Sequence, residues 1–302
     1  MVKQDFVALK KVVLKTTTSS VRRQLLLLRD GLLHANAQAR AMLGHSGSLP
    51  GFIIIGAQKC GTTHLYDELS KHPFVAPALT KEVHFFDSNF DKGIKWYQTF
   101  FPDLTRAQSD SCEYVITGEA SPSYLFHPHA ARHVYQILPE TKLIVILRDP
   151  VARAYSHYQH EVRLGYETLS FADAIERENT QLQAERKRMV EDRSYYSHDY
   201  MHFSYLSRGI YVDQIQAWHR EFRKAQVLIL KAEHFFQDTP RMVAKVADFL
   251  GLPRWKYESR REPKAFPYPQ LDEDIKRYLV GYFRPHNARL YDYLETDFGW
   301  ER

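Results

Sequence analysis

The stretch from Phe52 to Thr63 constrains the fold more than any other part of this 302-residue chain. It opens with the apolar run Phe-Ile-Ile-Ile, whose β-branched residues favour a short buried strand. A turn bounded by Gly56 and Gly61 follows, and beyond it Leu65 and Leu69 have the spacing of one helix face. The pattern predicts a strand, a glycine turn and a helix in succession. This geometry points unpaired backbone N–H groups at an anion.

The polar side chains of the turn also suit a phosphate. Lys59 lies inside the turn, and Thr62 and Thr63 follow its second glycine. The spacing G-x-x-K-x-G-T-T differs from the G-x-x-x-x-G-K-[ST] of nucleoside triphosphatases, because the lysine precedes the second glycine. From this place Lys59 can reach a bridging oxygen near the 5′ end of a nucleotide. The motif alone leaves open a purely structural glycine turn.

Apolar runs and helical patterns alternate along the rest of the chain. The clearest strand covers residues 142–147, whose unbroken apolar run is typical of the centre of a parallel sheet. We therefore predict an α/β protein with a P-loop-like three-layer fold, in which a central, mostly parallel sheet is flanked by helices. Residues 51–302 would form this domain. Two separate helices, over 271–283 and 288–294, are expected to close it.

Residues 1–50 are predicted to be a helical leader and linker. Leucines lie near one face of a helix over 21–43, which predicts a docking or dimerisation helix and so a homodimer; a loosely packed leader is the alternative. No apolar run approaches the ~18 residues of a membrane span. Two cysteines, Cys60 and Cys112, imply no disulfide framework and favour a reducing compartment. We expect a cytoplasmic protein without an integral membrane segment.

Candidate functional residues follow three predicted strands, at the sheet edge where open α/β sheets bind ligands. The first is Lys59. The second is Glu119 with Ser121, where backbone hydrogen bonding is the simpler role. The third is Arg148, followed by Ser156 near the start of a helix. A guanidinium and a hydroxyl there would hold a second phosphate. Alternatively, Arg148 could form an ion pair with Asp149 alone. Two anion sites suggest a nucleotide with phosphates on its 5′ and 3′ positions.

Residues 52–69 together with 143–160 resemble the sulfotransferases that use 3′-phosphoadenosine 5′-phosphosulfate (PAPS). The first segment resembles their 5′-phosphosulfate loop and the second their 3′-phosphate motif. Segments 81–87 and 92–97 resemble the heparan sulfate N- and 3-O-sulfotransferase branch, here as a soluble, bacterial-type member. The resemblance implies transfer of a sulfuryl group from PAPS to a hydroxyl or amine, with a saccharide as the expected acceptor.

The resemblance also implies roles for individual residues. Lys59 matches the lysine on the bridging oxygen, Glu82 the catalytic base, and His160 a histidine near the N-sulfotransferase active centre. No metal is implied. The chain departs from the heparan enzymes at Ala120, where they carry a lysine. The implied cofactor-binding residues are Lys59, Cys60, Gly61, Thr62, Thr63, Arg148, Ser156 and Lys264.

Two other functions compete with this interpretation. A P-loop kinase using ATP and magnesium would need the Walker-type Lys-Ser/Thr pair, which the turn lacks. A non-catalytic polyanion-binding protein would use only the basic surface, consistent with a net charge of +5. Nucleic-acid binding has no motif behind it. At the residue level, Glu82 could be a surface carboxylate paired with Lys81, His84 a packing residue, and His160 an ordinary helix-face histidine. If segment 80–87 is extended, Glu82 and His84 share one side.

Overall fold

A computed structural model describes residues 19–105, 115–257 and 267–300 of the chain. Its centre is a five-stranded sheet with the order β2-β3-β1-β4-β5, in which every pairing is parallel. The predicted α/β fold is therefore confirmed. The strands are β1 (Phe52–Gly56), β2 (Val75–Pro77), β3 (Ile116–Ala120), β4 (Lys142–Leu147) and β5 (Val227–Lys231).

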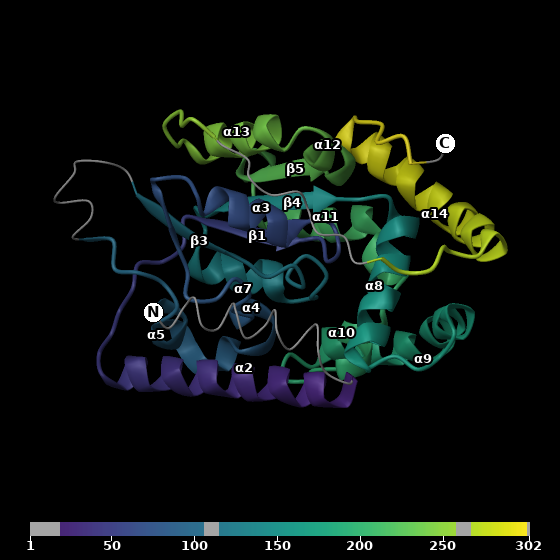
Figure 1. Cartoon of the computed structure of the whole chain (residues 1–302), viewed down its shortest axis with the longest axis horizontal. Helices are drawn as coiled ribbons and strands as arrows, with labels where there is room; N and C mark the ends of the chain where they lie inside the picture. The colour runs from purple at the N-terminus through teal and green to yellow at the C-terminus, as the bar shows by residue number, and fades with distance from the viewer. Residues whose placement is uncertain (1–18, 106–114, 258–266, 301–302) are drawn as a thin grey trace.

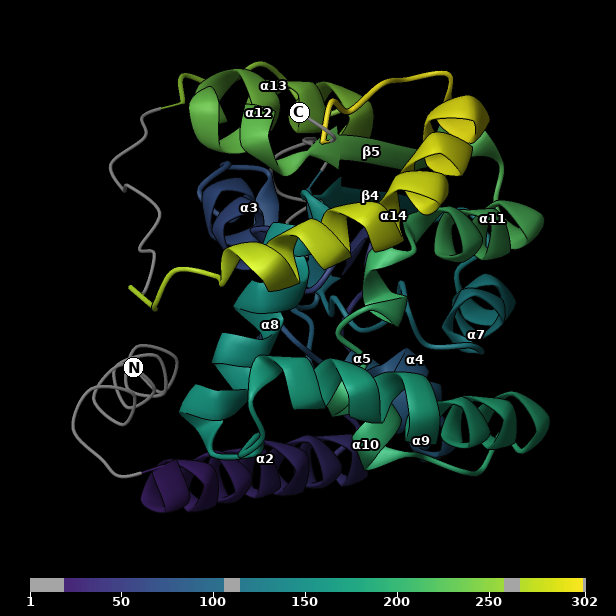
Figure 2. The same ribbon diagram turned by 90° about the vertical axis from the view of Figure 1, so that its right-hand side faces the viewer.

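The two central strands are apolar because helices cover both of their faces. Ile53 to Ile55 of β1 and Leu143 to Leu147 of β4 have no exposed surface. Figure 2 shows α3 (Thr62–Leu69) on one side of the sheet, and α7 (Ala130–Ile137) and α11 (Tyr211–Glu221) on the other. A strand covered on both faces has no need of alternating polar residues, which explains the unbroken runs in the sequence.

A second layer of helices lies beyond the carboxyl end of β4. There α8 (Pro150–Leu164) leaves the sheet and runs down to α9 (Phe171–Glu191) and α10 (His198–Phe203), as Figure 1 shows. The helix begins where the Asp149 carboxylate accepts the N–H of Val151 at 2.9 Å, and Pro150 occupies the first turn. These helices share a second apolar core with α14. The α8 helix thus carries residues from the sheet edge into a separate helical layer.

The chain closes with one helix, α14 (Glu273–Leu294), and the prediction of two helices was wrong. Pro285 lies inside it. Leu279, Phe283 and Leu290 form a buried face that continues past the proline, so tertiary packing maintains the helix across the break. The preceding elements on this edge of the sheet are α12 (Ala232–Gln237) and α13 (Thr239–Leu250).

The segment 80–87 is not extended. It bends at His84, whose φ of 54° is left-handed, and enters the short helix α4 (Phe85–Ser88). A 3-10 turn at Phe90–Lys92 and α5 (Gly93–Gln98) follow, with Trp96 and Tyr97 in the core. Burial of the aromatic side chains that follow the bend explains why the strand pattern fails here.

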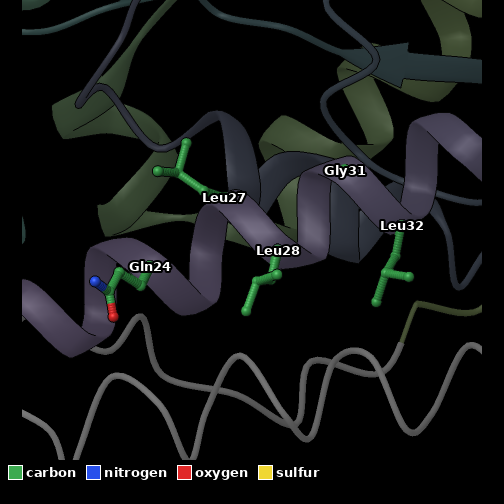
Figure 3. Close-up of a pocket in the computed structure, with 5 residues that line it drawn as sticks. All are labelled: Gln24, Leu27, Leu28, Gly31 and Leu32. Atoms are coloured by element: carbon green, nitrogen blue, oxygen red, sulfur yellow. The ribbon is translucent and has the colours of Figure 1, made fainter.

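The predicted leader helix exists as α2 (Ser19–Met42), which lies along the edge of the molecule beneath α5 and α10 in Figure 1. A hollow of about 560 Å³ lies on this helix. Figure 3 shows the residues that line it. Within the described ranges, no helix is long and apolar enough to cross a membrane. The domain boundary at residue 50 stays a prediction. The hollow is lined by Gln24, Leu27, Leu28, Gly31 and Leu32.

Candidate active site

The turn between β1 and α3 has the shape expected of an anion cradle. Lys59 and Gly61 both have left-handed backbones, with φ of 69° and 101°. The N–H of Ala57 donates to the carbonyl of Ile146 at 2.8 Å, which ties the turn to β4. No side chain of the described residues caps α3, so the N–H groups of its first turn remain available to a bound anion.

The structure brings Lys59 and Arg148 together. Because β1 and β4 are neighbours, their carboxyl ends meet, and the Arg148 guanidinium donates to the Lys59 carbonyl at 3.3 Å. Burial, together with the charges of Arg163 and Arg148, lowers the pKa of Lys59 to about 8, while Glu161 and Glu82 oppose the shift. The two predicted anion sites therefore adjoin along one cationic edge.

Cys60 contributes to the turn by packing. Its thiol is buried, and its Sγ lies 3.9 Å from the hydroxyl of Tyr211. Its N–H already donates to the carbonyl of Ala57 at 3.2 Å. Burial raises the pKa of this thiol to about 11, so the neutral form is favoured. The Tyr211 hydroxyl in turn donates to the Arg148 carbonyl at 2.8 Å. Tyr211 therefore links the turn after β1 to the residues that follow β4.

The other predicted cofactor residues differ in how far their side chains are exposed. Thr62 is buried and Thr63 is exposed at the start of α3. Ser156 lies in the second turn of α8, which begins at Pro150, and it is 9% exposed. Lys264, like Cys112, lies outside the described residues.

Glu82 belongs to a chain of charged groups. It forms an ion pair with Lys81, and its second oxygen lies 3.6 Å from Nε2 of His84. The Nδ1 atom of His84 lies 2.9 Å from Asp87, which also accepts from the hydroxyl of Ser123. Burial lowers the pKa of His84, but the charge and hydrogen bond of Asp87 outweigh it and raise that pKa well above its usual value. An imidazolium therefore lies between two carboxylates and orients Glu82.

Glu119 holds this segment in place. It is fully buried, and its carboxylate accepts from Ser121 at 2.7 Å and from Tyr97 at 2.6 Å. It also accepts from the backbone N–H of Val83 at 3.3 Å and from Tyr124 at 3.1 Å. The bond from Val83 joins β3 to the residue that follows Glu82, which agrees with a structural role for Glu119.

His160 is a neutral imidazole near these groups. Arg163 donates to its Nδ1 at 2.9 Å, so we assign the ring proton to Nε2. Burial and the charge of Lys59 lower the pKa of His160 to about 3, while Glu82 acts on it in the opposite direction. An electrostatic interaction therefore connects three residues from separate parts of the sequence, Lys59, Glu82 and His160.

Sequence reasoning missed several residues of this cluster. Asp87 follows His84 at the i,i+3 spacing, a signal that would have found it had α4 been predicted. Ser123 reaches Asp87 only through the tertiary fold, whereas Arg163 follows His160 at the same i,i+3 spacing on α8. Glu161, next to His160, lies 3.1 Å from Nδ1 of His202 and 3.5 Å from Nε2 of His157, and no sequence signal pointed to it.

Comparison with known proteins identifies the class. The profile of the sulfotransferase domain matches residues 49–276, and a crystal structure of a sulfotransferase from Alicyclobacillus acidocaldarius superposes with a TM-score of 0.62. That structure is 30% identical to this chain and covers 84% of it, and all of the matched chain is aligned. The chain therefore belongs to the sulfotransferase family, which confirms the resemblance predicted above. Neither the kinase nor the polyanion-binding alternative is supported.

The curated relatives narrow the similarity further. Human heparan sulfate glucosamine 3-O-sulfotransferase 3B1 is 32% identical over 280 residues, which cover 85% of this chain and 66% of the relative. Human bifunctional heparan sulfate N-deacetylase/N-sulfotransferase 3 is 30% identical over 277 residues, covering 80% of this chain and 29% of the relative. The membrane-associated sulfotransferase kil1 of Dictyostelium discoideum is 26% identical over 318 residues, which cover 84% of this chain and 67% of the relative. The chain spans about two thirds of the 3-O-sulfotransferase and less of the bifunctional enzyme.

Proposed function

We propose that the protein transfers the sulfuryl group of PAPS to a hydroxyl or amine of a carbohydrate. The observation that carries this proposal is the Arg148 guanidinium on the Lys59 carbonyl, which joins two cationic strand ends into one site. A nucleotide phosphorylated on both its 5′ and 3′ positions is the anion that suits two such ends. Membership in the sulfotransferase family supports PAPS as that nucleotide.

In this reaction Lys59 and the first turn of α3 bind the 5′ side of PAPS, and Arg148 with Ser156 binds the 3′-phosphate. Glu82 removes the proton of the acceptor hydroxyl or amine, whose oxygen or nitrogen forms the new bond to sulfur. The bond between sulfur and the bridging oxygen breaks, and the electron pair stays on the departing phosphate. Lys59 meets this growing charge, a contribution often worth several kcal/mol. The analogy is with phosphoryl transfer.

His84 and His160 have different parts in this scheme. The imidazolium of His84, fixed by Asp87, orients the Glu82 carboxylate. His160 is neutral, and its Nε2–H can donate to a sulfonate oxygen without a second cation competing with Lys59. Glu82, oriented by His84, is therefore the base, and His160 on α8 is a hydrogen-bond donor to the sulfonate.

A carbohydrate acceptor is supported by the names of the relatives, which are heparan sulfate sulfotransferases. The atom sulfated is left open by Ala120, which replaces a lysine of those enzymes. Incubation with labelled PAPS and a panel of oligosaccharides, with products identified by mass spectrometry, would establish acceptor and position.

The test of the reaction separates binding from transfer. Calorimetry should show phosphoadenosine phosphate (PAP) binding without magnesium, and no binding of ATP. Lys59→Ala should weaken PAP binding and abolish transfer. Glu82→Gln should lose transfer by at least a hundredfold while PAP still binds. Transfer that survives in Glu82→Gln would remove the base from the mechanism.

Three further properties stay predictions. A homodimer through α2 is supported by its exposed Leu27, Leu28 and Leu32, and light scattering on the full chain tests it. A cytoplasmic location and independence from metal rest on the sequence alone. Fractionation of the native host and activity after chelation would test them.

A further inference from the structure

The peptide group between Arg148 and Asp149 is held at both of its polar ends by side chains. The hydroxyl of Tyr211 on α11 donates to its carbonyl at 2.8 Å, and its N–H donates to the carboxylate of Glu233 on α12 at 2.9 Å. This peptide stands where β4 ends and α8 begins. Its backbone groups are therefore satisfied by two helices that lie far from it in the sequence.

These contacts reach the nucleotide site through Arg148. Its guanidinium donates to the Lys59 carbonyl at 3.3 Å, and the hydroxyl of Tyr211 also lies 3.9 Å from Sγ of Cys60, the residue after Lys59. The four residues thus form a closed ring of contacts between the two strand ends. One guanidinium nitrogen makes the bond to Lys59, and the five N–H donors of the group leave others for a phosphate. The position of the Arg148 backbone determines where those donors lie.

Trp300 joins the two side chains that hold this peptide. Its indole N–H donates to the second oxygen of Glu233 at 3.4 Å, and its ring centroid lies 5.8 Å from that of Tyr211. The chain returns to this place after α14, across the end of β5 (Figure 2), where Lys231 donates to the carbonyl of Phe298. Both oxygens of Glu233 therefore accept a hydrogen bond, and Trp300 restrains Glu233 together with Tyr211.

Neither Tyr211 nor Glu233 is suited to touch the nucleotide. Tyr211 is only 1% exposed, and a carboxylate such as that of Glu233 repels a phosphate. We propose that the two are positioning residues: by holding the peptide after Arg148, they aim its guanidinium at the 3′-phosphate and make binding selective for nucleotides that carry this group. The inference rests on the proposed function, which assigns the 3′-phosphate to Arg148.

The test compares two nucleotides that differ only in the 3′-phosphate, PAP and adenosine 5′-phosphate, by calorimetry on the full chain. Tyr211→Phe removes one buried hydrogen bond and should weaken PAP binding about tenfold, while the affinity for adenosine 5′-phosphate stays within about twofold of wild type. Tyr158→Phe is the matched control, because its hydroxyl donates to the backbone carbonyl of Leu169 at 2.9 Å, and both affinities should be unchanged. A variant that merely disturbs the fold lowers both affinities.

Further variants test the route of the effect. Glu233→Ala removes the acceptor of the same peptide and should also weaken PAP binding about tenfold. In an Arg148→Ala background, Tyr211→Phe should weaken PAP binding by less than about twofold, because its effect passes through Arg148. If Tyr211→Phe or Glu233→Ala does not fold, Trp300→Phe replaces it. This variant loses the donor to Glu233 and should weaken PAP binding about threefold, with adenosine 5′-phosphate unaffected.

The outcomes separate this inference from the proposed function. An unchanged ratio of the two affinities in Tyr211→Phe, or in Trp300→Phe where that variant replaces it, would overturn the inference. A full tenfold loss in the Arg148→Ala background would do the same. Both results would leave the proposed function standing as long as the wild-type protein binds PAP more tightly than adenosine 5′-phosphate. Equal wild-type affinities for the two nucleotides would contradict the 3′-phosphate site itself, and the inference with it.

Discussion

The carboxylate of Glu119 can be tested by the exchange of one heavy atom, an oxygen for a nitrogen, in Glu119→Gln. Its two oxygens accept four hydrogen bonds, two on each oxygen. The amide of glutamine must place an NH₂ group where one oxygen was. On the side of Val83 it would face a backbone N–H that cannot reverse its role.

On the other side the amide would face Tyr97 and Tyr124. The hydroxyl of Tyr97 can rotate and accept. Tyr124 cannot follow, because its oxygen already accepts from the N–H of Phe85 at 2.8 Å, so its own hydrogen has to point at residue 119. At least one buried donor is therefore left facing another donor. We expect a loss of about 2–3 kcal/mol in unfolding free energy, the cost of a lost bond plus an unsatisfied buried group.

Urea denaturation followed by tryptophan fluorescence measures this loss, and a thermal melt should show a fall of about 5 °C. Glu140→Gln is the control, since this glutamate is 82% exposed in its ion pair with Arg223 and should change stability by less than about 0.5 kcal/mol. Equal stability of the two variants would refute the accounting of donors. Because Glu119 anchors the segment that carries Glu82, kcat should also fall more than the affinity for PAP.

Three other outcomes are expected. The interaction with His84 lowers the pKa of Asp87 to about 2 although burial opposes this shift, so the interaction stabilises the fold above pH 4. About 2 kcal/mol of unfolding free energy should be lost as pH falls toward 2, and again as pH rises through the raised pKa of His84. In Asp87→Asn, unfolding curves measured across pH should lack both of these pH-dependent losses. Since the pKa of Lys59 is about 8, kcat/KM for the free enzyme should decline as pH rises through that value; a flat profile to pH 9.5 would contradict it. Gly61→Ala forces a side chain onto a φ of 101° and a Cβ to within 2.8 Å of Phe236, which should cost about 1–3 kcal/mol and weaken PAP binding at least tenfold in calorimetry.

The parts of the fold that the sequence predicts are those where local pattern and tertiary environment agree. β1 and β4 are covered on both faces, so burial alone explains their composition, and their neighbours in sequence are helices that must cross over. The two failures have one cause. Pro285 breaks a helix in isolation, and His84 resists a left-handed backbone, but packed side chains on either side hold both against their local preference.

The site divides along the same line. Lys59 and Gly61 form a donor cradle within a dozen residues, and the meeting of Lys59 with Arg148 follows from the parallel order of β1 and β4. The acceptor side is different in kind. Glu82 is oriented by His84 and Asp87, and the loop that carries it is held from β3, so its geometry depends on contacts between segments about forty residues apart.

This difference has a consequence for how the enzyme can change. A cradle made of backbone N–H groups and one lysine tolerates little variation, because a side chain at Gly61 strains the turn. The acceptor side is assembled from side chains on α4, α8 and the loop after β3, none of which is part of the sheet. Substitutions that alter acceptor choice should therefore lie in these elements and leave PAP affinity unchanged, whereas substitutions in the turn should lower transfer to every acceptor alike.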